Sequence, residues 1–466
     1  LFVSDGPFLV FPRLLEGRGL NGEKVLKISH DITLNLERTS VFPETLLIRT
    51  FEDGSLVNNY VDGHVHNKHM YHDTKKMAAV IMKEADGVHV EGLLGHDFRI
   101  EPMPHLERSL DGHVAHMIHP VKQRVPYRGD HDLHCEKYFY TKNTNDVICI
   151  FRFFYSEGRS ADAIYPEVHI FLDSSTCQAY NYNKTEITNY LSVMTIAANL
   201  RYRSVSHPSV KLVIVAITLV RVSTSEPYMT FYKDSKDMVL FGETLNKFMA
   251  YHRADREYKN ADIYFLITGK NMSEWNGQTL ESWVGGYAYL GTVCSQWKTG
   301  MCEDRPTSYY GAYVFTHELA HNLGCSHDES GPTDWVKGHI GSLDCPWSEG
   351  YLMSYKMQDE RQYEFSYCCE REIRNLYNRP EFKCLRERNR PKSVHSIKSS
   401  KLPGDKTSLT NYCKRVYKYM KGMKADTTYA NQQCKVNCRL PDNNYWILGV
   451  PDGTPCGKGN THVSRC

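Results

Sequence analysis

The segment HELAHNLGCSHDE, from His317 to Glu329, brings three histidines and a glutamate into one short stretch of chain. His317 and His321 are four residues apart, so in a helix their imidazoles leave from the same face. Apolar residues at three- and four-residue spacing around them favour a helix, and Gly324 predicts its end. A turn at that glycine can bring His327 back toward the other two histidines.

Three neutral imidazole ligands would leave the fourth tetrahedral position of a zinc ion open to water. Glu318 follows the first ligand directly, where its carboxylate can take a proton from that water. The alternative interpretation is a set of core histidines with ordinary hydrogen bonds, which would not need this spacing. We therefore predict one catalytic Zn²⁺, with His317, His321 and His327 as metal ligands and Glu318 as the catalytic residue.

The pattern H-E-x-x-H-x-x-G-x-x-H resembles the metzincin signature, and Asp328 after the third histidine resembles its reprolysin (adamalysin) branch. The resemblance implies that Met353, in CPWSEGYLMSY, lies in a Met-turn and forms an apolar floor beneath the histidines. The segment GGYAYLGTVC, residues 285–294, resembles the rim segment that aligns substrate by strand addition. With Cys325 in the motif and cysteines in the tail, the sequence is most similar to the secreted salivary metalloproteases of ticks.

Tyr355, two residues after Met353, departs from the reprolysin pattern. It stands where the astacin and serralysin branches carry a tyrosine that can approach the zinc, and reprolysins usually have none. The sequence leaves two interpretations open for this residue. A packed position in the wall of the site is the more common role of a single aromatic residue, and approach to the metal is the alternative.

The chain has 466 residues, a net charge of +2 and 15 cysteines. That length suggests three units. The near-balance of charge indicates neither a nucleic-acid partner nor a membrane partner. No apolar run is long enough for a membrane span, and the longest, 212–220, predicts a buried strand. So many cysteines without C-x-x-C pairs predict an oxidising compartment and a secreted, extracellular protein. The opening LFVSDGPFLVFP resembles the end of a trimmed signal peptide.

The predicted fold is an α/β metzincin catalytic domain, with a twisted mixed sheet, helices and an irregular lower subdomain. A β-rich prodomain precedes it and a small cysteine-rich domain follows. We expect strands at 167–173, 210–222 and 261–269 and helices at 184–204 and 237–254. The expected boundaries are 1–150 for a separate propeptide (ending somewhere within 124–160), 160–389 for the reprolysin-type zinc metalloprotease domain, and 390–466 for a basic linker and cysteine-rich domain that could be truncated.

The resemblance implies a disulfide between Cys294 and Cys384. The pairing of five further cysteines stays open: Cys302, Cys325, Cys345, Cys368 and Cys369. Asn183 and Asn271 begin N-x-S/T sequons and are glycosylation candidates.

Cys135 is the first cysteine of the chain and the candidate cysteine switch. In reprolysin zymogens an unpaired thiolate of this kind occupies the open position on zinc. A local bridge between Cys135 and Cys149 is the alternative, because the residues around Cys135 lack the familiar switch context. Removal of the propeptide is expected between Arg124 and Arg159.

The resemblance implies a secreted zinc endopeptidase made as a zymogen, which hydrolyses extracellular proteins such as fibrinogen, fibrin or matrix proteins through a water activated by Glu318. A calcium ion is compatible with the family, although no motif specifies one. The alternative function is an adhesion or binding protein on a protease scaffold. It would use the cysteine-rich tail, the RGD at 128–130, or sulfated glycans bound by the basic stretch 386–424. Retention of Glu318 favours the enzyme, since a scaffold needs no proton acceptor there.

Overall fold

The computed structural model describes residues 6–16, 23–52, 55–121, 163–221, 225–255, 260–282, 285–356, 358–387, 408–416, 420–426, 435–449, 455–456 and 464–465. The chain divides into two compact units, Leu1–Pro391 and Lys392–Cys466. Cys135, Cys149, the RGD tripeptide and the expected propeptide cleavage region lie outside the described residues. Within the described residues, no helix has the length and apolar character needed to cross a membrane.

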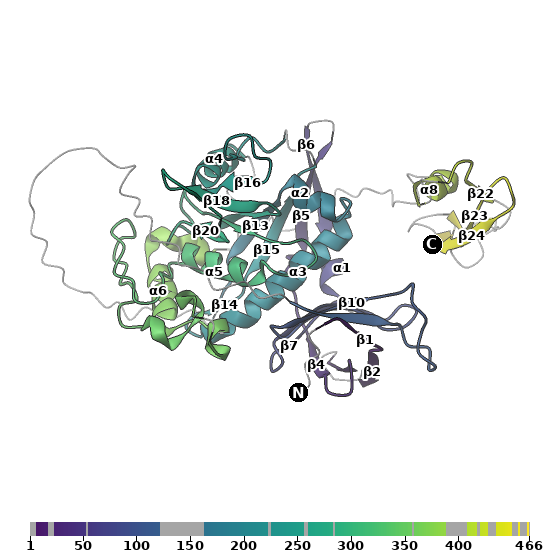
Figure 1. Cartoon of the computed structure of the whole chain (residues 1–466), viewed down its shortest axis with the longest axis horizontal. Helices are drawn as coiled ribbons and strands as arrows, with labels where there is room; N and C mark the ends of the chain where they lie inside the picture. Colours follow the sequence, from purple (N-terminus) through teal and green to yellow (C-terminus); the bar gives the residue numbers. More distant parts are fainter. Residues whose placement is uncertain are drawn as a thin grey trace, which may run out of the picture. The chain divides into compact units, whose positions relative to one another are not determined.

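The central element of the first unit is a sheet with the strand order β20-β21-β17-β13-β15-β5-β6 (Figure 1). Its inner strands pair in parallel, while β20 at one edge and β6 at the other are antiparallel to their neighbours. The strand bounds are β5 Thr45–Glu52, β6 Ser55–Asp62, β13 Glu167–Leu172, β15 Val213–Leu219, β17 Ile263–Thr268, β20 Gly286–Ala288 and β21 Thr299–Glu303. The predicted mixed sheet is therefore present, and the strands expected at 167–173, 210–222 and 261–269 are confirmed.

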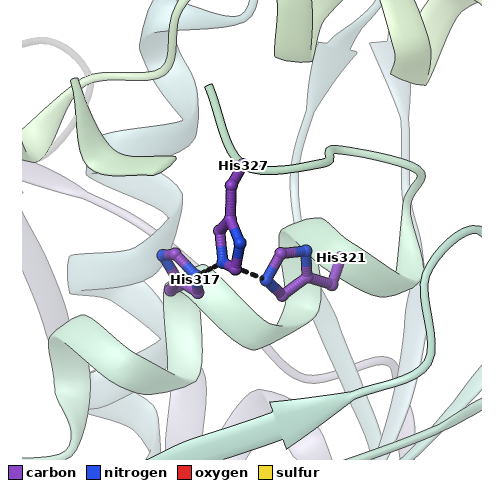
Figure 2. Close-up of side chains that lie close together, drawn as sticks. All are labelled: His317, His321 and His327. Atoms are coloured by element: carbon purple, nitrogen blue, oxygen red, sulfur yellow. Dashed lines mark hydrogen bonds between the residues drawn. The ribbon is translucent and has the colours of Figure 1, made fainter. Parts of the chain in front are cut away.

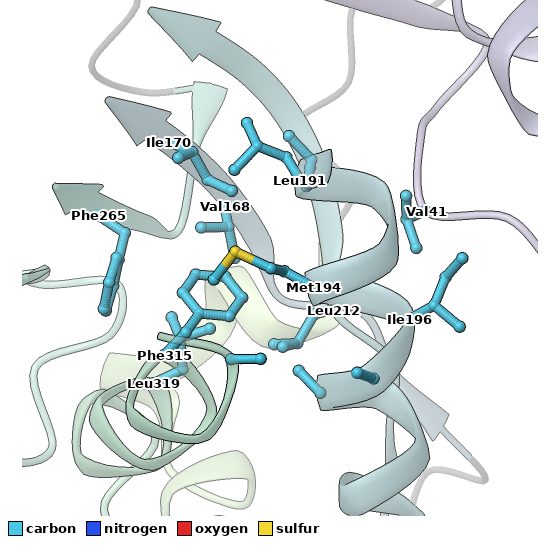
Figure 3. Packing of buried hydrophobic residues seen from close by; sticks show 14 of the residues in the cluster. Val41, Val168, Ile170, Leu191, Met194, Ile196, Leu212, Phe265, Phe315 and Leu319 are labelled. Carbon is cyan, nitrogen blue, oxygen red and sulfur yellow. The ribbon is translucent and has the colours of Figure 1, made fainter. Parts of the chain in front are cut away.

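Helices cover both faces of this sheet, which explains why every residue of β13 is buried. Ile170 packs in one core cluster with residues of α3 (Lys184–Arg201) and α5 (Ala312–Asn322) (Figure 3). Phe171, which points to the opposite face, packs with residues of α4 (Phe241–Arg253). The alternating side chains of one strand thus serve two hydrophobic cores.

The helix expected at 237–254 begins later than predicted. Residues Met238–Leu240 form strand β16, which pairs in parallel with β18 (Asn271–Trp275), and helix α4 starts at Phe241. Pairing with a distant strand overrides the local helical pattern at this end. The remaining short elements are β12 Ala163–Ile164, α2 Ser174–Ala179, η2 Tyr202–Ser204, β14 Ser209–Val210 and β19 Leu280–Glu281.

The N-terminal region, residues 6–121, is rich in strands as predicted. Its own antiparallel sheet has the order β1-β11-β10-β9-β8-β7-β4-β3-β2. The bounds are β1 Phe8–Val10, β2 Arg13–Glu16, β3 Lys24–Lys27, β4 Thr33–Arg38, α1 Gly63–Asn67, β7 Met70–Asp73, β8 Ala78–Lys83, β9 His89–Leu94, β10 Phe98–Pro102 and β11 His116–Pro120. The remaining pair of strands, the hairpin β5–β6, belongs to the central sheet of the first unit instead.

The N-terminal region shares its packing with the residues that follow, in contrast to the separate unit expected. Leu46 and Ile48 of β5 lie in the same core cluster as residues of α3 and α5. Val41 belongs to this cluster too (Figure 3). β5 pairs with β15, with Leu47 opposite Ala216. The segment boundaries expected from the sequence stay predictions, but residues 6–121 and 163–387 form one compact body.

Three side-chain contacts reinforce this shared packing. The Arg49 guanidinium forms a buried ion pair with Asp255. Asn189 of α3 donates a hydrogen bond to the carboxylate of Glu91 on β9. In the turn before β10, the ring of His96 stacks on the ring of Tyr363, with ring centroids 3.4 Å apart.

The part of the first unit after Gly324 is irregular, as predicted, and is cross-linked by disulfides. The predicted pair Cys294–Cys384 is confirmed, and the pairs left open by the sequence are Cys325–Cys369 and Cys345–Cys368. Its regular elements are short: η5 Trp347–Glu349, η6 Leu352–Ser354, η7 Glu360–Tyr363, α6 Tyr367–Tyr377 and η8 Pro380–Arg386. Disulfides limit the unfolded ensemble where little sheet or helix is available to hold the chain.

The second unit is small. Its core consists of Cys413, Met423, Val436 and Cys438, with a disulfide between the two cysteines. Its elements are α8 Leu409–Val416, β22 Lys424–Asp426, β23 Lys435–Arg439, β24 Tyr445–Gly449, β25 Pro455–Cys456 and β26 Ser464–Arg465.

Candidate metal centre

The three predicted ligands converge on one point (Figure 2). The Nε2 atoms of His317 and His327 are 3.3 Å apart, and those of His321 and His327 are 3.1 Å apart. Tetrahedral ligands about 2.0–2.1 Å from a zinc ion lie roughly 3.3 Å from one another. The donor set and its spacing therefore fit a zinc ion.

Hydrogen bonds from Nδ1 orient two of these rings. The Nδ1–H of His317 donates to the carbonyl of Leu352 at 3.2 Å, and that of His321 donates to the carbonyl of Cys325 at 2.7 Å. A proton on Nδ1 leaves the lone pair of Nε2 directed at the shared point. Burial lowers the pKa of His321 to about 4 and places the pKa values of His317 and His327 well below the ordinary range. Neutral imidazoles, the form that binds metal, are thus favoured.

The turn that returns His327 requires a glycine. Gly324 has a φ of 102°, and a Cβ there would lie 2.9 Å from the side chain of Leu376. Its N–H donates to the carbonyl of His321, which closes the C-terminus of α5 as predicted. Any other residue at this position would meet both backbone strain and a clash.

Glu318 is buried on α5 beside the rim strand β20, with 2% of its surface exposed. A Cβ built on Gly286 of that strand would lie 2.5 Å from the Glu318 carboxylate oxygen Oε1. The absence of a side chain at Gly286 therefore leaves the space that the Glu318 side chain occupies.

Met353 is fully buried in η6, within a turn that is tied to two parts of the histidine motif. The carbonyl of Leu352 accepts the hydrogen bond from His317, and the carbonyl of Met353 accepts one from the N–H of Asp328. The Asp328 carboxylate accepts a hydrogen bond from Ser366 at 2.7 Å, and burial raises its pKa to about 6. Asp328 thus connects the end of the motif to the start of α6.

The structure brings Tyr355 to the histidines, the alternative that the sequence analysis did not favour. Its hydroxyl oxygen lies 2.9 Å from Nε2 of His317 and 2.8 Å from Nε2 of His327. Tyr355 has a φ of 55°, a left-handed conformation that is costly for a bulky residue and is found mostly at functional sites.

Residues 167–366 match Reprolysin_5, described as metallo-peptidase family M12. The chain carries a reprolysin-type metallopeptidase domain. Over 393 residues it is 26% identical to a venom metalloproteinase of Olivierus martensii and 25% identical to the venom metalloproteinase antarease of Tityus serrulatus. Each of these matches covers 81% of this chain and 92% of the relative.

A third relative is a protein of Bombyx mori named "A disintegrin and metalloproteinase with thrombospondin motifs like". It is 24% identical over 327 residues, which cover 66% of this chain. The match spans only 46% of that protein. The family assignment implies a catalytic zinc for the reprolysin domain, and the histidine triad is a group of residues that could hold it.

The two glycosylation candidates lie at the surface of the reprolysin domain. Asn183 is the exposed N-cap of α3, where its Oδ1 accepts hydrogen bonds from the N–H groups of Thr185 and Glu186. Asn271, in β18, donates from its amide nitrogen to Asp237. Glycosylation at either residue stays a prediction.

His339 is a positioning residue that the sequence analysis missed. Its ring is buried, Nδ1 accepts from the N–H of Thr333, and Nε2–H donates to the carbonyl of Gly324. The loop after His327 is thereby fixed to the glycine turn. The spacing from His327 carries no periodic signal, so only the fold reveals this contact.

Proposed function

We propose that this chain is a secreted zinc endopeptidase that is made as a zymogen and hydrolyses extracellular proteins. The observation that carries the proposal is the convergence of three buried Nε2 atoms, with Glu318 on the helix that bears His317 and His321 and an edge strand beside it. The disulfides of the reprolysin domain and the venom relatives support secretion. Fibrinogen, fibrin and matrix proteins are the proposed substrates.

His317, His321 and His327 would hold the zinc ion, which supplies a Lewis acid that polarises a peptide carbonyl and acidifies water. Glu318 accepts the proton of the attacking water and passes it to the leaving amine. Burial of its carboxylate excludes competing solvent from this transfer. The open edge of β20 offers backbone groups to an extended peptide, which it would align by strand addition.

We also assign Tyr355 a role in this reaction. Its hydroxyl is 2.8–2.9 Å from two ligand nitrogens, close enough to donate a hydrogen bond to an oxygen that gains negative charge at the same point. Tyr355→Phe is expected to lower kcat by roughly 10-fold or more and to leave KM nearly unchanged. A rise in KM with unchanged kcat would show that Tyr355 shapes the pocket instead.

The decisive test replaces Glu318. Because Glu318 is not among the ligands, Glu318→Ala should retain zinc and lose peptide cleavage by about 10²–10⁴-fold. Zinc content by elemental analysis and cleavage of casein or fibrinogen by activated protein give the two readouts. His321→Ala is the matched variant, which should lose zinc and activity together. Near wild-type cleavage by Glu318→Ala would remove Glu318 from the mechanism.

Latency is proposed to depend on Cys135 as a cysteine switch. If its thiolate blocks the metal, the Cys135→Ala zymogen should cleave substrate before propeptide removal. Unchanged latency, or a mapped disulfide between Cys135 and Cys149, would indicate that the N-terminal region blocks the site sterically. Cys177, which is buried and whose pKa is raised by that burial, is the matched control because its thiol cannot reach solvent.

A further inference from the structure

The rim of the catalytic sheet leads directly to a metal ligand. β20 is the terminal strand of the sheet and pairs on one side with β21, among the residues that the structure describes. The chain continues from β20 through Leu290 to Gly291, whose N–H donates to the carbonyl of His321 at 2.8 Å. A peptide paired with the open edge of β20 would therefore run past the metal-binding point.

A loop from the other side of the histidine motif packs against the end of this rim. Val336 approaches Gly291 so closely that a Cβ on the glycine would lie 2.7 Å from it. The preceding residue, Trp335, donates from its indole nitrogen to the carbonyl of Leu290 at 3.4 Å. The two contacts place the indole beside the last residues of the rim.

The same loop is held rigidly at its base. The buried His339 bridges the loop to Gly324, and the N–H groups of Ile340 and Gly341 both donate to the carboxylate of Glu372 at 2.7 and 2.8 Å. Glu372 is itself fully buried on α6. An aromatic side chain on such a loop loses little additional conformational entropy when it binds a partner.

Trp335 remains 57% exposed despite this support. Single exposed apolar residues are ordinary, but a tryptophan fixed through its N–H leaves its apolar face available for contact. Its place at the end of the substrate-aligning edge separates it from the exposed Trp275, which lies on β18 and stacks on Tyr232.

We propose that Trp335 is a specificity-determining residue, which forms an apolar subsite for a substrate side chain on the amino-terminal side of the scissile bond. The inference rests on the proposed peptidase function. Antiparallel pairing, the more stable arrangement, would place the amino-terminal part of the substrate at the carboxyl end of β20, beside Leu290. The substrate class is an extended peptide with a large aliphatic or aromatic residue two to four positions before the cleaved bond.

The experiment compares fluorogenic peptides that are identical except for leucine or serine at one of those positions. Wild-type enzyme should prefer leucine, and Trp335→Ala should reduce this ratio of kcat/KM roughly tenfold, mainly through KM. Trp335→Phe should keep most of the preference. Trp275→Ala and Leu343→Ser, which change exposed apolar residues elsewhere, should keep all of it.

Trp335→Glu provides a test that does not depend on loss. A carboxylate at this place should shift the preference from leucine to lysine at the same peptide position. In a Glu318→Ala background, titration with the uncleaved leucine and serine peptides should show the same preference as a difference in Kd, lost in Trp335→Ala.

An unchanged leucine preference in folded, zinc-loaded Trp335→Ala and Trp335→Glu would overturn the proposal, as would a preference confined to positions after the scissile bond. Failure of the wild-type enzyme to cleave any peptide would instead overturn the proposed function. The two failures are therefore distinguishable.

Discussion

The N-terminal region and the C-terminal unit differ in how they relate to the reprolysin domain, although the sequence predicts both as separate segments. Residues 6–121 contribute strand β5 to the catalytic sheet and share its core, whereas Lys392–Cys466 form a compact unit around a small core of their own. A change in amino-acid composition therefore marks where one segment of the chain ends and another begins. It does not show whether a segment packs independently.

The largest expected effect comes from deleting each region in turn. Without residues 1–121, β15 loses the strand beside it and the apolar side chains that pack with Leu46 and Ile48 meet water. When made alone, residues 163–466 should therefore give much less soluble, zinc-binding monomer than the same residues released by proteolysis after the whole chain has folded, measured by size-exclusion chromatography and metal analysis. Equal yields of folded zinc protein from the two sources would contradict this role of the N-terminal region.

Truncation after Arg390 is the matched deletion. All the metal ligands and the Met-turn precede this point, so cleavage of a short peptide should be nearly unchanged. We propose that the basic, cysteine-rich tail contributes to recognition of large substrates, so cleavage of a large matrix protein should weaken. Equal loss on both substrates would show that the C-terminal unit also supports the catalytic fold.

The ion pair between Arg49 and Asp255 links the N-terminal region to the reprolysin domain. The side chains are only 4% and 11% exposed, so Arg49→Ala leaves a buried carboxylate without this partner. We expect a loss of about 3–5 kcal/mol in the free energy of unfolding, measured by urea denaturation. Arg108→Ala removes an exposed ion pair with Asp86 within the N-terminal sheet and should cost less than about 1 kcal/mol. Similar losses in both variants would show that the ion pair at Arg49 does not stabilise the packing of the N-terminal region on the reprolysin domain.

The smallest expected effect is a dependence of stability on pH, through the contact between His96 of the N-terminal region and Tyr363. Burial, with a contribution from the Arg201 charge, lowers the pKa of His96 to about 3 in the folded protein. His96 binds a proton more readily in the unfolded chain than in the folded protein. The free energy of unfolding is therefore highest above pH 6.5 and declines as the pH falls toward 3. At pH 5.5 the loss from this group is about 1 kcal/mol relative to neutral pH.

His96→Phe should keep the stacking on Tyr363 and remove this component. The difference in thermal stability between pH 7.5 and 5.5 should therefore be smaller in this variant than in the wild type. His30→Phe is the control, because the His30 side chain is exposed and pairs with the neighbouring Asp31. An identical pH dependence in wild type and His96→Phe would exclude titration of His96 as a cause.

The parts of the site that could be predicted from the sequence are those that local geometry encodes. The four-residue interval between His317 and His321, with a glycine after the helix, leaves few alternatives once the segment is helical. The family resemblance added Met353 and the disulfide Cys294–Cys384. The helical spacing of the histidines needs no information about distant segments. For Met353 and the disulfide, the family resemblance supplies that information.

The missed features depend on long-range packing. The pairing of β5 with β15 follows from the register of two apolar strands far apart in the chain, and many other apolar strands carry the same pattern. Tyr355 approaches the histidines from a left-handed backbone conformation, and no periodicity in the sequence predicts that conformation. The predicted start of α4 was wrong for the same reason, because residues 238–240 form a strand by pairing with the distant β18.

The insertion of β5 between β6 and β15 also affects biosynthesis. Residues 45–62 leave the ribosome as a hairpin long before β15 is made, so the edge that will receive β15 stays open during synthesis. An unpaired edge of a β-strand is a template for intermolecular association. Nascent chains of this protein should therefore depend on molecular chaperones until residue 219 has emerged, and the yield of folded protein should fall when chaperones are limiting.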